Sequence, residues 1–456
     1  MDKRGYILLL AIGCWLLAGC GRTATVEEVS IVPEPLFVVE KEGSFTLHNT
    51  VRVSVSGIGQ NTASVRYILQ SMRKMHMRPR MVATTESSDM RLLIEERENP
   101  EMGTEGYLIE VRPGGVTLRA NSEEGLFYAY QSLVQMLPAD MEERVYGSVV
   151  LPECTVLDRP RMGWRGVELD AGHVAFSPRE VRRWIEVMAM YKMNRLVVRS
   201  EEEWLSDEER ESLVEYGMER NVKLVEVGCD SGYTAVADGE EMPLVCANLK
   251  EGMDSARAGR RVAMSPEEYC DLATYPADAR YQGVAAEGMT TLAKAYQFDP
   301  APIGTNQHVE ANICGGLCRL STSRLSSTAE AEYMLLPRML AIAEALWSQR
   351  DSKNWMRFRR RVESEKDRLE AKGYSYCEGS FTPMFTARKV DDRTMSIAIE
   401  TEVPNTYIFY TTDGTTPTRQ SNIYLGPFDL ERGTHLKILP VYKNIERDSV
   451  YEYIIR

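Results

Sequence analysis

The sequence predicts an α/β protein built in three parts, and three observations along the chain indicate them. The middle alternates helix-like segments with short apolar runs, as in a parallel sheet covered by helices. The region before it mixes strand-like and helix-like segments, which predicts a smaller α+β domain. The end of the chain alternates apolar and polar residues between turns, which favours a β-sandwich. We place these domains at 30–157, 158–375 and 380–456.

Length and charge limit the function classes. A chain of 456 residues is long enough for about three domains. Its formal net charge of −13 repels phosphate backbones, and no basic stripe is visible along the chain. These two features exclude nucleic acid as an expected partner.

The first residues, "MDKRGYILLLAIGCWLLAGC", have a cationic start and a short apolar run. The run is too short to span a bilayer comfortably and predicts a signal peptide over 1–19. Its ending, Leu-Ala-Gly-Cys, resembles the lipobox of bacterial lipoproteins, which implies lipid on Cys20 and anchoring at the cell envelope. An ordinary secretion signal is the alternative. Residues 20–29 are polar and are expected to form a tether.

Two signals define the N-terminal domain. The spacing of apolar residues predicts a helix over 62–75. Pro113-Gly114-Gly115 predicts the turn of a hairpin, and a helix that carries apolar residues from Leu126 to Leu137 follows it.

The middle domain begins with two capped helices. Ser177 and Glu180 form a capping box with proline at the first helical position, and Ser206 and Glu209 form another. Apolar strands follow these helices, at 194–199 and 222–227. Two long helices are expected to close the domain, over 331–347 and 352–372.

The C-terminal residues predict antiparallel strands. The segment 396–430 alternates in polarity around a turn at Asp413-Gly414, and 435–443 supplies a later strand.

Taken together, these segments resemble glycoside hydrolase family 20, the β-N-acetylhexosaminidases. "EGYLIEVRPGGVTLRANSEEGLFYAYQSLVQMLP" resembles the family's N-terminal domain, and "WRGVELDAGHVAFSPREVRRWIEVMAMYKMNRL" resembles the first strand and helix of its barrel. "EYMLLPRMLAIAEALWS" resembles its closing helices, and "IFYTTDGTTPTRQSNIYLGPFDL" is similar to the chitobiase-type C-terminal module. The resemblance implies a TIM-type (β/α) barrel with an N-terminal α+β domain and a C-terminal β-sandwich.

The resemblance also implies a mechanism that needs no cofactor and no metal. In this family the acetamido oxygen of the sugar attacks its own anomeric carbon, an exception to the usual pair of protein carboxylates. An adjacent Asp-Glu pair at a strand end orients the acetamido group and protonates the leaving oxygen. Tryptophans surround the sugar ring, and an arginine from the first strand holds its hydroxyls.

This chain departs from that pattern. Leu169 and Asp170 match the family's first-strand motif, but His173 stands where the family has arginine. Val197, Val198 and Arg199 replace a His-Trp-His motif, and 321–323 replace a late Trp-Thr-Glu. The Gly-Gly-Asp-Glu segment of the catalytic pair has no counterpart. Because 158–375 is also shorter than the roughly 250 residues of a complete barrel, we expect an incomplete or rebuilt barrel without its fourth and fifth strands.

Few residues remain as site candidates. Asp238 and Glu240, in "ADGEE", are weak candidates for a displaced catalytic pair, and a solvated turn is the alternative. Other polar and aromatic residues are candidates for lining a glycan groove, with packing or a leftover polar rim as the alternative: Asp170, His173, Trp204, Tyr233, Tyr269 and Asp271.

The remaining cysteines and the tryptophans are expected to be structural. Cys314 and Cys318 have no matching second pair, so zinc is not favoured. We interpret most cysteines as buried apolar side chains, with one disulfide left open. The expected core tryptophans are Trp164, Trp184, Trp347 and Trp355.

The expected function is therefore that of a lipid-anchored, non-catalytic relative of the hexosaminidases. It would bind a glycan containing N-acetylhexosamine or assemble with partners in glycan use. An active β-N-acetylhexosaminidase with a rearranged site is the first alternative, and a scaffold without a sugar site is the second. Missing strands would leave sheet edges unpaired, so we expect residues 230–260 or a homodimer to cover the gap.

Overall fold

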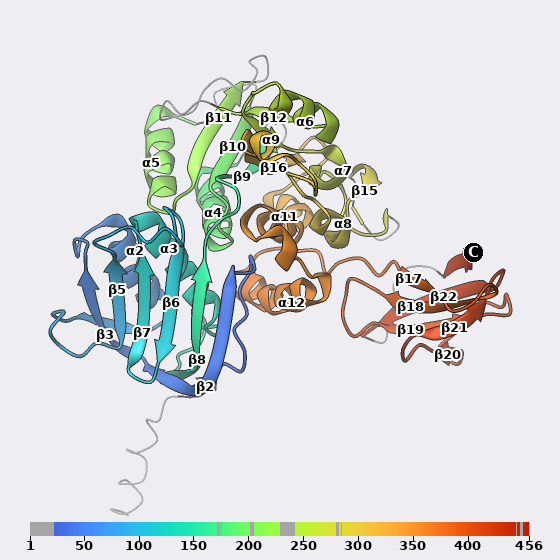
Figure 1. Ribbon diagram of the computed structural model, residues 1–456, viewed down its shortest axis with the longest axis horizontal. Coiled ribbons are helices and arrows are strands. Elements are labelled where there is room, and N and C mark those ends of the chain that lie inside the picture. The colour runs from blue at the N-terminus through green and yellow to red at the C-terminus, as the bar shows by residue number, and fades with distance from the viewer. Residues whose placement is uncertain are drawn as a thin grey trace, which may run out of the picture.

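The structure is a computed structural model that describes residues 22–170, 174, 176–200, 205–228, 242–279, 282–283, 285–443, 445–446 and 450–455. An N-terminal sheet domain adjoins a helix-covered parallel sheet, and a small β-module lies to one side (Figure 1). No helix in the described ranges combines the length and apolar character needed to cross a bilayer.

The N-terminal domain is an eight-stranded sheet in the order β1-β8-β6-β7-β5-β3-β4, with β2 also paired to β8. Its strands are β1 (Thr23–Thr25), β2 (Phe37–His48), β3 (Thr50–Ser56), β4 (Arg78–Met81), β5 (Met90–Ile94), β6 (Tyr107–Arg112), β7 (Gly115–Ala120) and β8 (Ser148–Asp158). Its helices, α2 (Ala63–Lys74) and α3 (Glu123–Gln135), confirm the two predicted helices, and β6 and β7 confirm the hairpin.

Part of the segment predicted to be a tether, 20–29, forms a strand of the N-terminal sheet instead. Thr23–Thr25 forms β1, which pairs in parallel with Ser148–Val150 of β8. Polar residues suit this edge because their side chains stay exposed or half-buried while the backbone makes the hydrogen bonds. The N-terminal sheet therefore begins earlier than its sequence pattern suggests.

The middle domain is a six-stranded sheet in the order β11-β10-β9-β16-β13-β12. All its strand pairs are parallel. Its strands are β9 (Trp164–Asp170), β10 (Arg195–Ser200), β11 (Lys223–Gly228), β12 (Leu244–Cys246), β13 (Val262–Met264) and β16 (Ile313–Ser321). The order matches a (β/α) barrel opened between its third strand, β11, and its sixth, β12.

The chain between those two edge strands is short. A strand and the connection that follows it take at least 18 residues in this sheet, from Leu244 to Val262, and about 30 from Trp164 to Arg195. Only residues 229–243 lie between β11 and β12. That length does not accommodate two further strand–helix units, since a parallel crossover alone needs a dozen or more residues. The prediction that the fourth and fifth strands are missing agrees with this topology.

Helices connect and cover the parallel sheet. α4 (Pro178–Met190) and α5 (Asp207–Met218) both begin with the predicted capping boxes. The other helices are α6 (Leu249–Arg257), α7 (Glu267–Cys270), α8 (Leu292–Tyr296), α9 (Gln307–Glu310), α10 (Thr328–Leu335), α11 (Arg338–Trp347), η2 (Arg350–Ser352) and α12 (Trp355–Ala371), with the small pair β14 (Thr274–Tyr275) and β15 (Ala286–Met289).

The prediction of a single helix over 331–347 was wrong, because the structure contains two helices there. α10 ends at Leu335, and Leu336 is extended with φ −98° and ψ 138°. Pro337 has no N–H to donate to the preceding turn, and its ring disfavours helical backbone in the residue before it. α11 therefore starts anew at Arg338.

The C-terminal module consists of two antiparallel sheets with their own apolar core, as predicted. In Figure 1 it is joined to α12 by an extended segment. Its strands are β17 (Met384–Lys389), β18 (Thr394–Glu400), β19 (Tyr407–Thr411), β20 (Asn422–Ile423), β21 (Phe428–Glu431), β22 (His435–Tyr442), β23 (Ile445–Glu446) and β24 (Tyr451–Ile454).

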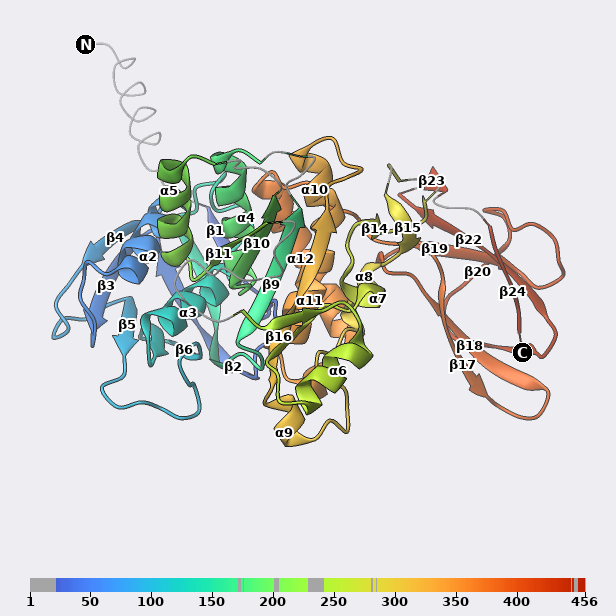
Figure 2. The same cartoon turned by 90° about the horizontal axis from the view of Figure 1, so that it is seen from above.

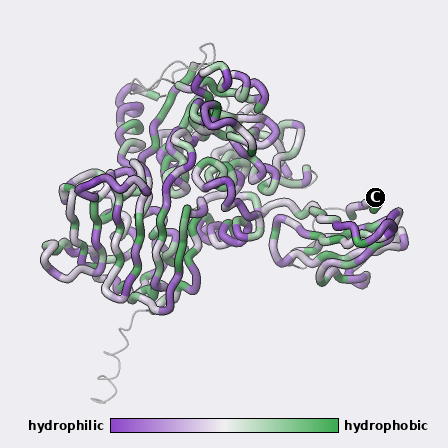
Figure 3. The backbone as a smooth tube through the Cα atoms, viewed as in Figure 1, coloured by the Kyte–Doolittle hydropathy of each residue, from purple (hydrophilic) through white to green (hydrophobic). Residues whose placement is uncertain are grey.

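One continuous apolar core runs through the N-terminal and middle domains. In Figure 3, hydrophobic residues follow the strands, whereas α5 and α12 are largely hydrophilic. Trp164, Trp184 and Trp347 are buried as predicted, and Trp355 is half-buried. Among the described cysteines, all are free thiols; Cys154, Cys246, Cys270, Cys318 and Cys377 are buried and Cys314 is half-buried.

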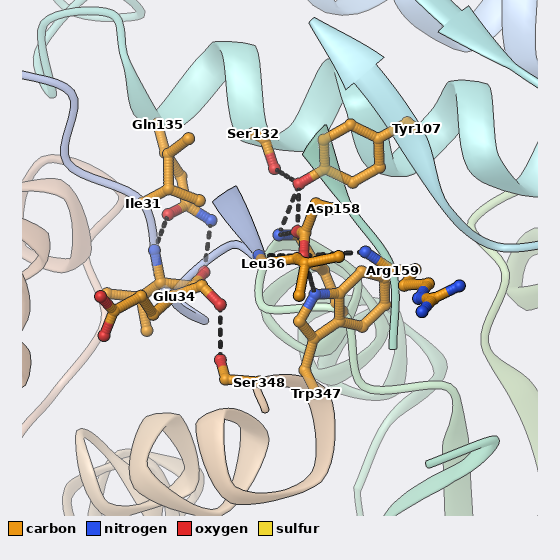
Figure 4. Close-up of polar contacts among 12 residues, drawn as sticks. Ile31, Glu34, Leu36, Tyr107, Ser132, Gln135, Asp158, Arg159, Trp347 and Ser348 are labelled. Carbon is orange, nitrogen blue, oxygen red and sulfur yellow. Dashed lines mark hydrogen bonds and ion pairs between the residues drawn. The ribbon is translucent and has the colours of Figure 1, made fainter. Parts of the chain in front are cut away.

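A buried polar cluster joins the two domains at Asp158, the last residue of β8 (Figure 4). Its carboxylate accepts hydrogen bonds from Tyr107 Oη (2.5 Å) and from Trp347 Nε1 (2.9 Å). Lys192 Nζ donates to the same carboxylate (3.0 Å). Lys192 and Asp158 are 0% and 1% exposed, so this charged pair is a structural contact closed to solvent.

Candidate functional site

The carboxyl ends of β9 and β16 meet side by side, because Asp170 pairs with Ser321 in the parallel register. Ser321 Oγ donates to Asp170 Oδ2 at 3.1 Å, and Thr322 Oγ1 donates to the Asp170 carbonyl at 2.6 Å. Val174 N donates in turn to Thr322 Oγ1 at 3.2 Å. The Ser321 hydrogen bond orients the Asp170 carboxylate, and the Thr322 contacts hold the backbone at the end of the strand, where barrel enzymes carry their active sites.

Asp271 lies on the other side of β16. It forms a parallel bridge with Arg319, and Leu272 N donates to the Arg319 carbonyl at 2.8 Å. Its Oδ1 accepts a hydrogen bond from Ala273 N at 3.0 Å. The structure therefore places the two predicted residues Asp170 and Asp271 on opposite flanks of the last residues of β16.

A further acidic residue stands one layer below Asp170. Glu168 is two residues earlier in β9, so its side chain leaves the strand on the same face. It is 7% exposed and pairs with Arg199 Nε at 3.2 Å. A complete barrel fills this interior with bulky apolar side chains. Sequence reasoning missed Glu168, although its two-residue spacing from Asp170 was a usable signal.

Tyr269, another candidate for lining a glycan groove, lies on a short helix. It lies in α7, and its ring centroid is 4.7 Å from Lys294 Nζ of α8. Burial raises the pKa of its hydroxyl, and the neighbouring Glu268 adds to that rise. One face of the ring is therefore occupied by a neighbouring helix.

Several predicted residues lie outside the described part of the chain. They are the lipidation site Cys20, the weak catalytic candidates Asp238 and Glu240, and the glycan-lining candidates His173, Trp204 and Tyr233. Within the described ranges, no three His, Cys, Asp or Glu side chains gather in a way that could hold a metal ion.

Chemically, the described strand ends offer carboxylates and hydroxyls. The carboxylate of Asp170 and the hydroxyls of Ser321 and Ser323 form a connected hydrogen-bonding group. Such groups can accept from and donate to the hydroxyls of a sugar. The residues at the position of the family's Trp-Thr-Glu carry no aromatic ring and no carboxylate.

Three sequence profiles match the chain in the order of its domains. "Glycosyl hydrolase family 20, domain 2" matches residues 28–159, and "Glycosyl hydrolase family 20, catalytic domain" matches 246–350. "Chitobiase/beta-hexosaminidase C-terminal domain" matches 391–452. The chain belongs to glycoside hydrolase family 20.

A beta-hexosaminidase of Porphyromonas gingivalis is similar to this chain, with 27% identity over 182 residues. The alignment covers 37% of this chain and 22% of that protein. A beta-hexosaminidase of Akkermansia muciniphila is 30% identical over 105 residues, covering 23% of this chain and 20% of that protein. The chain thus spans about a fifth of the length of the curated relatives it matches.

Solved structures show the same fold. The N-acetyl-beta-hexosaminidase of Streptomyces plicatus aligns with a TM-score of 0.64 and 18% identity, over 76% of this chain and 96% of that one. The beta-N-acetylhexosaminidase of Bacteroides fragilis aligns with a TM-score of 0.61 and 17% identity, over 76% and 97%. This likeness confirms a TIM-type barrel domain that follows an N-terminal domain in the chain.

Proposed function

We propose that this chain is a non-catalytic member of family 20 that binds glycan containing N-acetylhexosamine. The observation that carries the proposal is the short connection between β11 and β12, since residues 229–243 leave no length for a fourth barrel strand together with the crossovers on either side of it. By the resemblance, that strand supplies the Asp-Glu pair, and loss of a positioned acid removes orders of magnitude of rate.

Retained polar groups support glycan binding at the same strand ends. Asp170 and Asp271 flank β16, and Ser321 orients the Asp170 carboxylate. The proteins that share this fold include the GH20 exo beta-N-acetylglucosaminidase of Vibrio harveyi, solved in complex with N-acetylglucosamine. A binding role uses these groups without requiring a general acid.

The alternative is an active β-N-acetylhexosaminidase with a rearranged site. The observation in its favour is that two carboxylates, Asp170 and Asp271, flank one strand end. The same chain holds Asp238 and Glu240 between β11 and β12. A scaffold without a sugar site is the third hypothesis.

Hydrolysis of a chromogenic N-acetylglucosaminide distinguishes the non-catalytic glycan binder from the active enzyme. We expect the chain beginning after Cys20 to show no turnover above background, with the Streptomyces plicatus enzyme as the positive control. Turnover that disappears in Asp170→Asn, Asp271→Asn or Glu240→Gln would establish the rearranged enzyme instead.

Binding of N,N′-diacetylchitobiose, measured by calorimetry, tests the glycan role. We expect Asp170→Ala to weaken binding about tenfold, because a charge-assisted hydrogen bond is worth about 1.5 kcal/mol or more. Asp391→Ala, an exposed aspartate of the C-terminal module, is the control. Failure of the wild type to bind would favour the scaffold.

We also propose that the chain is a lipoprotein of the bacterial envelope, anchored through Cys20. The lipobox-like ending of residues 1–20 supports this. In a bacterial host, labelled palmitate should enter the wild type and not the Cys20→Ser variant. Label in that variant would contradict the anchor.

A homodimer through the barrel gap is a further part of the proposal. Among the described strands, β11 pairs only with β10 and β12 only with β13, so each presents one open edge. Sedimentation of the soluble chain should give a dimer. A monomer at micromolar concentration would instead assign the covering role to the chain's own residues.

A further inference from the structure

A groove of about 960 Å³ lies away from the strand ends, where the N-terminal domain meets the outside of the parallel sheet domain. Residues of α2, α3, α4, α5 and α10 line it, together with the chain that follows α12. Figure 2 shows α5, α4 and α10 in succession along this side of the molecule. The volume is at the upper end of the roughly 300–1,000 Å³ of ligand sites.

The floor of the groove is built from paired charges. Arg220 Nε donates to Glu186 Oε1 at 2.8 Å, and its guanidinium stacks 3.4 Å from the centroid of the Tyr216 ring. Arg183 pairs with Glu332, whose side chain is buried. Stacked and paired guanidinium groups hold a fixed geometry, so the floor is preorganised.

The rim carries an excess of positive charge. Lys74 ends α2 and Arg179 lies in the first turn of α4; both are exposed, and in the described ranges neither forms an ion pair. The groove lining holds six basic side chains, Lys74, Arg179, Arg182, Arg183, Arg220 and Lys372, and four acidic ones, Glu142, Glu180, Glu186 and Glu332. This surplus of two cations stands out on a chain of net charge −13 and attracts an anion.

The other lining groups suit a hydroxyl-rich ligand. Gln70, Ser71 and Ser375 present amide and hydroxyl groups, which donate to and accept from sugar hydroxyls. Arg182 Nη2 donates to Ser212, while its Nε has no acceptor among the described residues.

We propose that this groove binds an acidic saccharide, with separate sugar carboxylates held at Lys74 and at Arg179. Lys74 belongs to the N-terminal domain and Arg179 to the middle domain, and both line this groove, so a ligand bound to both bridges the two domains. This site is separate from the strand ends, and its existence does not depend on whether those ends bind or cleave glycan.

Calorimetry with a galacturonic acid trimer, and with the same trimer reduced to its neutral form, tests the proposal. The wild type should bind the acidic trimer at least tenfold more tightly than the neutral one, and 0.5 M salt should weaken binding by screening. Lys74→Ala/Arg179→Ala should lose at least tenfold in affinity.

The matched control is Lys250→Ala/Arg388→Ala, which removes two exposed cations from α6 and β17 and should keep wild-type affinity. Diacetylchitobiose binding, if present in the wild type, should survive both double variants, which separates this site from the strand ends. Equal loss in the control, equal binding of the neutral trimer, equal binding of inorganic phosphate, or no binding of the acidic trimer would each overturn the proposal.

Discussion

At the residue scale, the charged side chains between the N-terminal and middle domains are the most constrained. Arg165 is 0% exposed, and its guanidinium donates to both oxygens of Glu105, at 3.0 and 2.6 Å. Burial opposes ionisation of Glu105, but the charge and hydrogen bonds of Arg165 outweigh it and hold the pKa of that carboxyl below its usual value. Glu105 therefore matters because it neutralises a buried cation.

We expect Glu105→Gln to destabilise the protein by about 3 kcal/mol at pH 7, because it leaves the buried Arg165 without a charged partner. Since the folded-state pKa is depressed, this stabilisation is present above pH 4.5, the ordinary value, and is lost as pH falls through the folded-state pKa. Urea unfolding at pH 7 and pH 3.5 measures the free energy of unfolding of both proteins. The difference between Glu105→Gln and the wild type should be smaller at pH 3.5. A gap that does not change with pH would contradict the assignment.

At the element scale, β16 organises the parallel sheet. It pairs with β9 along seven residues, from Gly315 with Trp164 to Ser321 with Asp170. Gly315 has a φ of +150°, and a Cβ built there would lie 1.9 Å from the Trp164 carbonyl oxygen. Only glycine fits this position without moving the neighbouring strand.

Gly315→Ala should therefore lower stability by about 2 kcal/mol or more, through strain and a separated strand pair. Thermal unfolding followed by circular dichroism measures the effect. Gly163→Ala is the matched control, because a Cβ there meets nothing within 4 Å, and it should change stability by less than about 0.5 kcal/mol. Similar losses in both variants would show that the close approach to Trp164 is unimportant.

At the scale of the whole molecule, polar contacts at Glu402 and Tyr451 hold the C-terminal module against the middle domain. Glu402 is 3% exposed, and its carboxylate accepts from Ala293 N of α8 at 2.6 Å and from Ser380 N at 2.8 Å. Tyr451 Oη also donates to Asp278 of the middle domain at 3.3 Å. The module has its own apolar core, so these contacts set its placement rather than its folding.

Glu402→Ala should loosen the module without unfolding it, because it leaves two buried N–H groups unpaired. Limited proteolysis should cut the segment 372–383 several-fold faster than in wild type. Glu400→Ala, a half-buried glutamate on β18, is the control and should keep the wild-type rate. Unchanged cleavage of Glu402→Ala would show that the apolar contacts alone hold the module.

Much of this architecture was predictable from local patterns. The capping boxes at Ser177 and Ser206, the hairpin at 113–115 and the three-part domain order all rest on residues close together in the chain. The helix break at Pro337 could also have been predicted from the proline, but the long apolar run around it favoured a single helix. The β1 strand was not predictable, because its pairing partner lies over a hundred residues away.

The sequence by itself determined the order of the described elements and the family, and it predicted a shortened barrel, because periodicity, caps, motif spacing and chain length are local properties. Only the tertiary structure decided that Asp170 and Asp271 flank β16, that Glu168 pairs with Arg199, and that Lys74 and Arg179 line one groove. These groups come from separate elements, and their approach depends on how strands pair and helices pack, which no local pattern encodes.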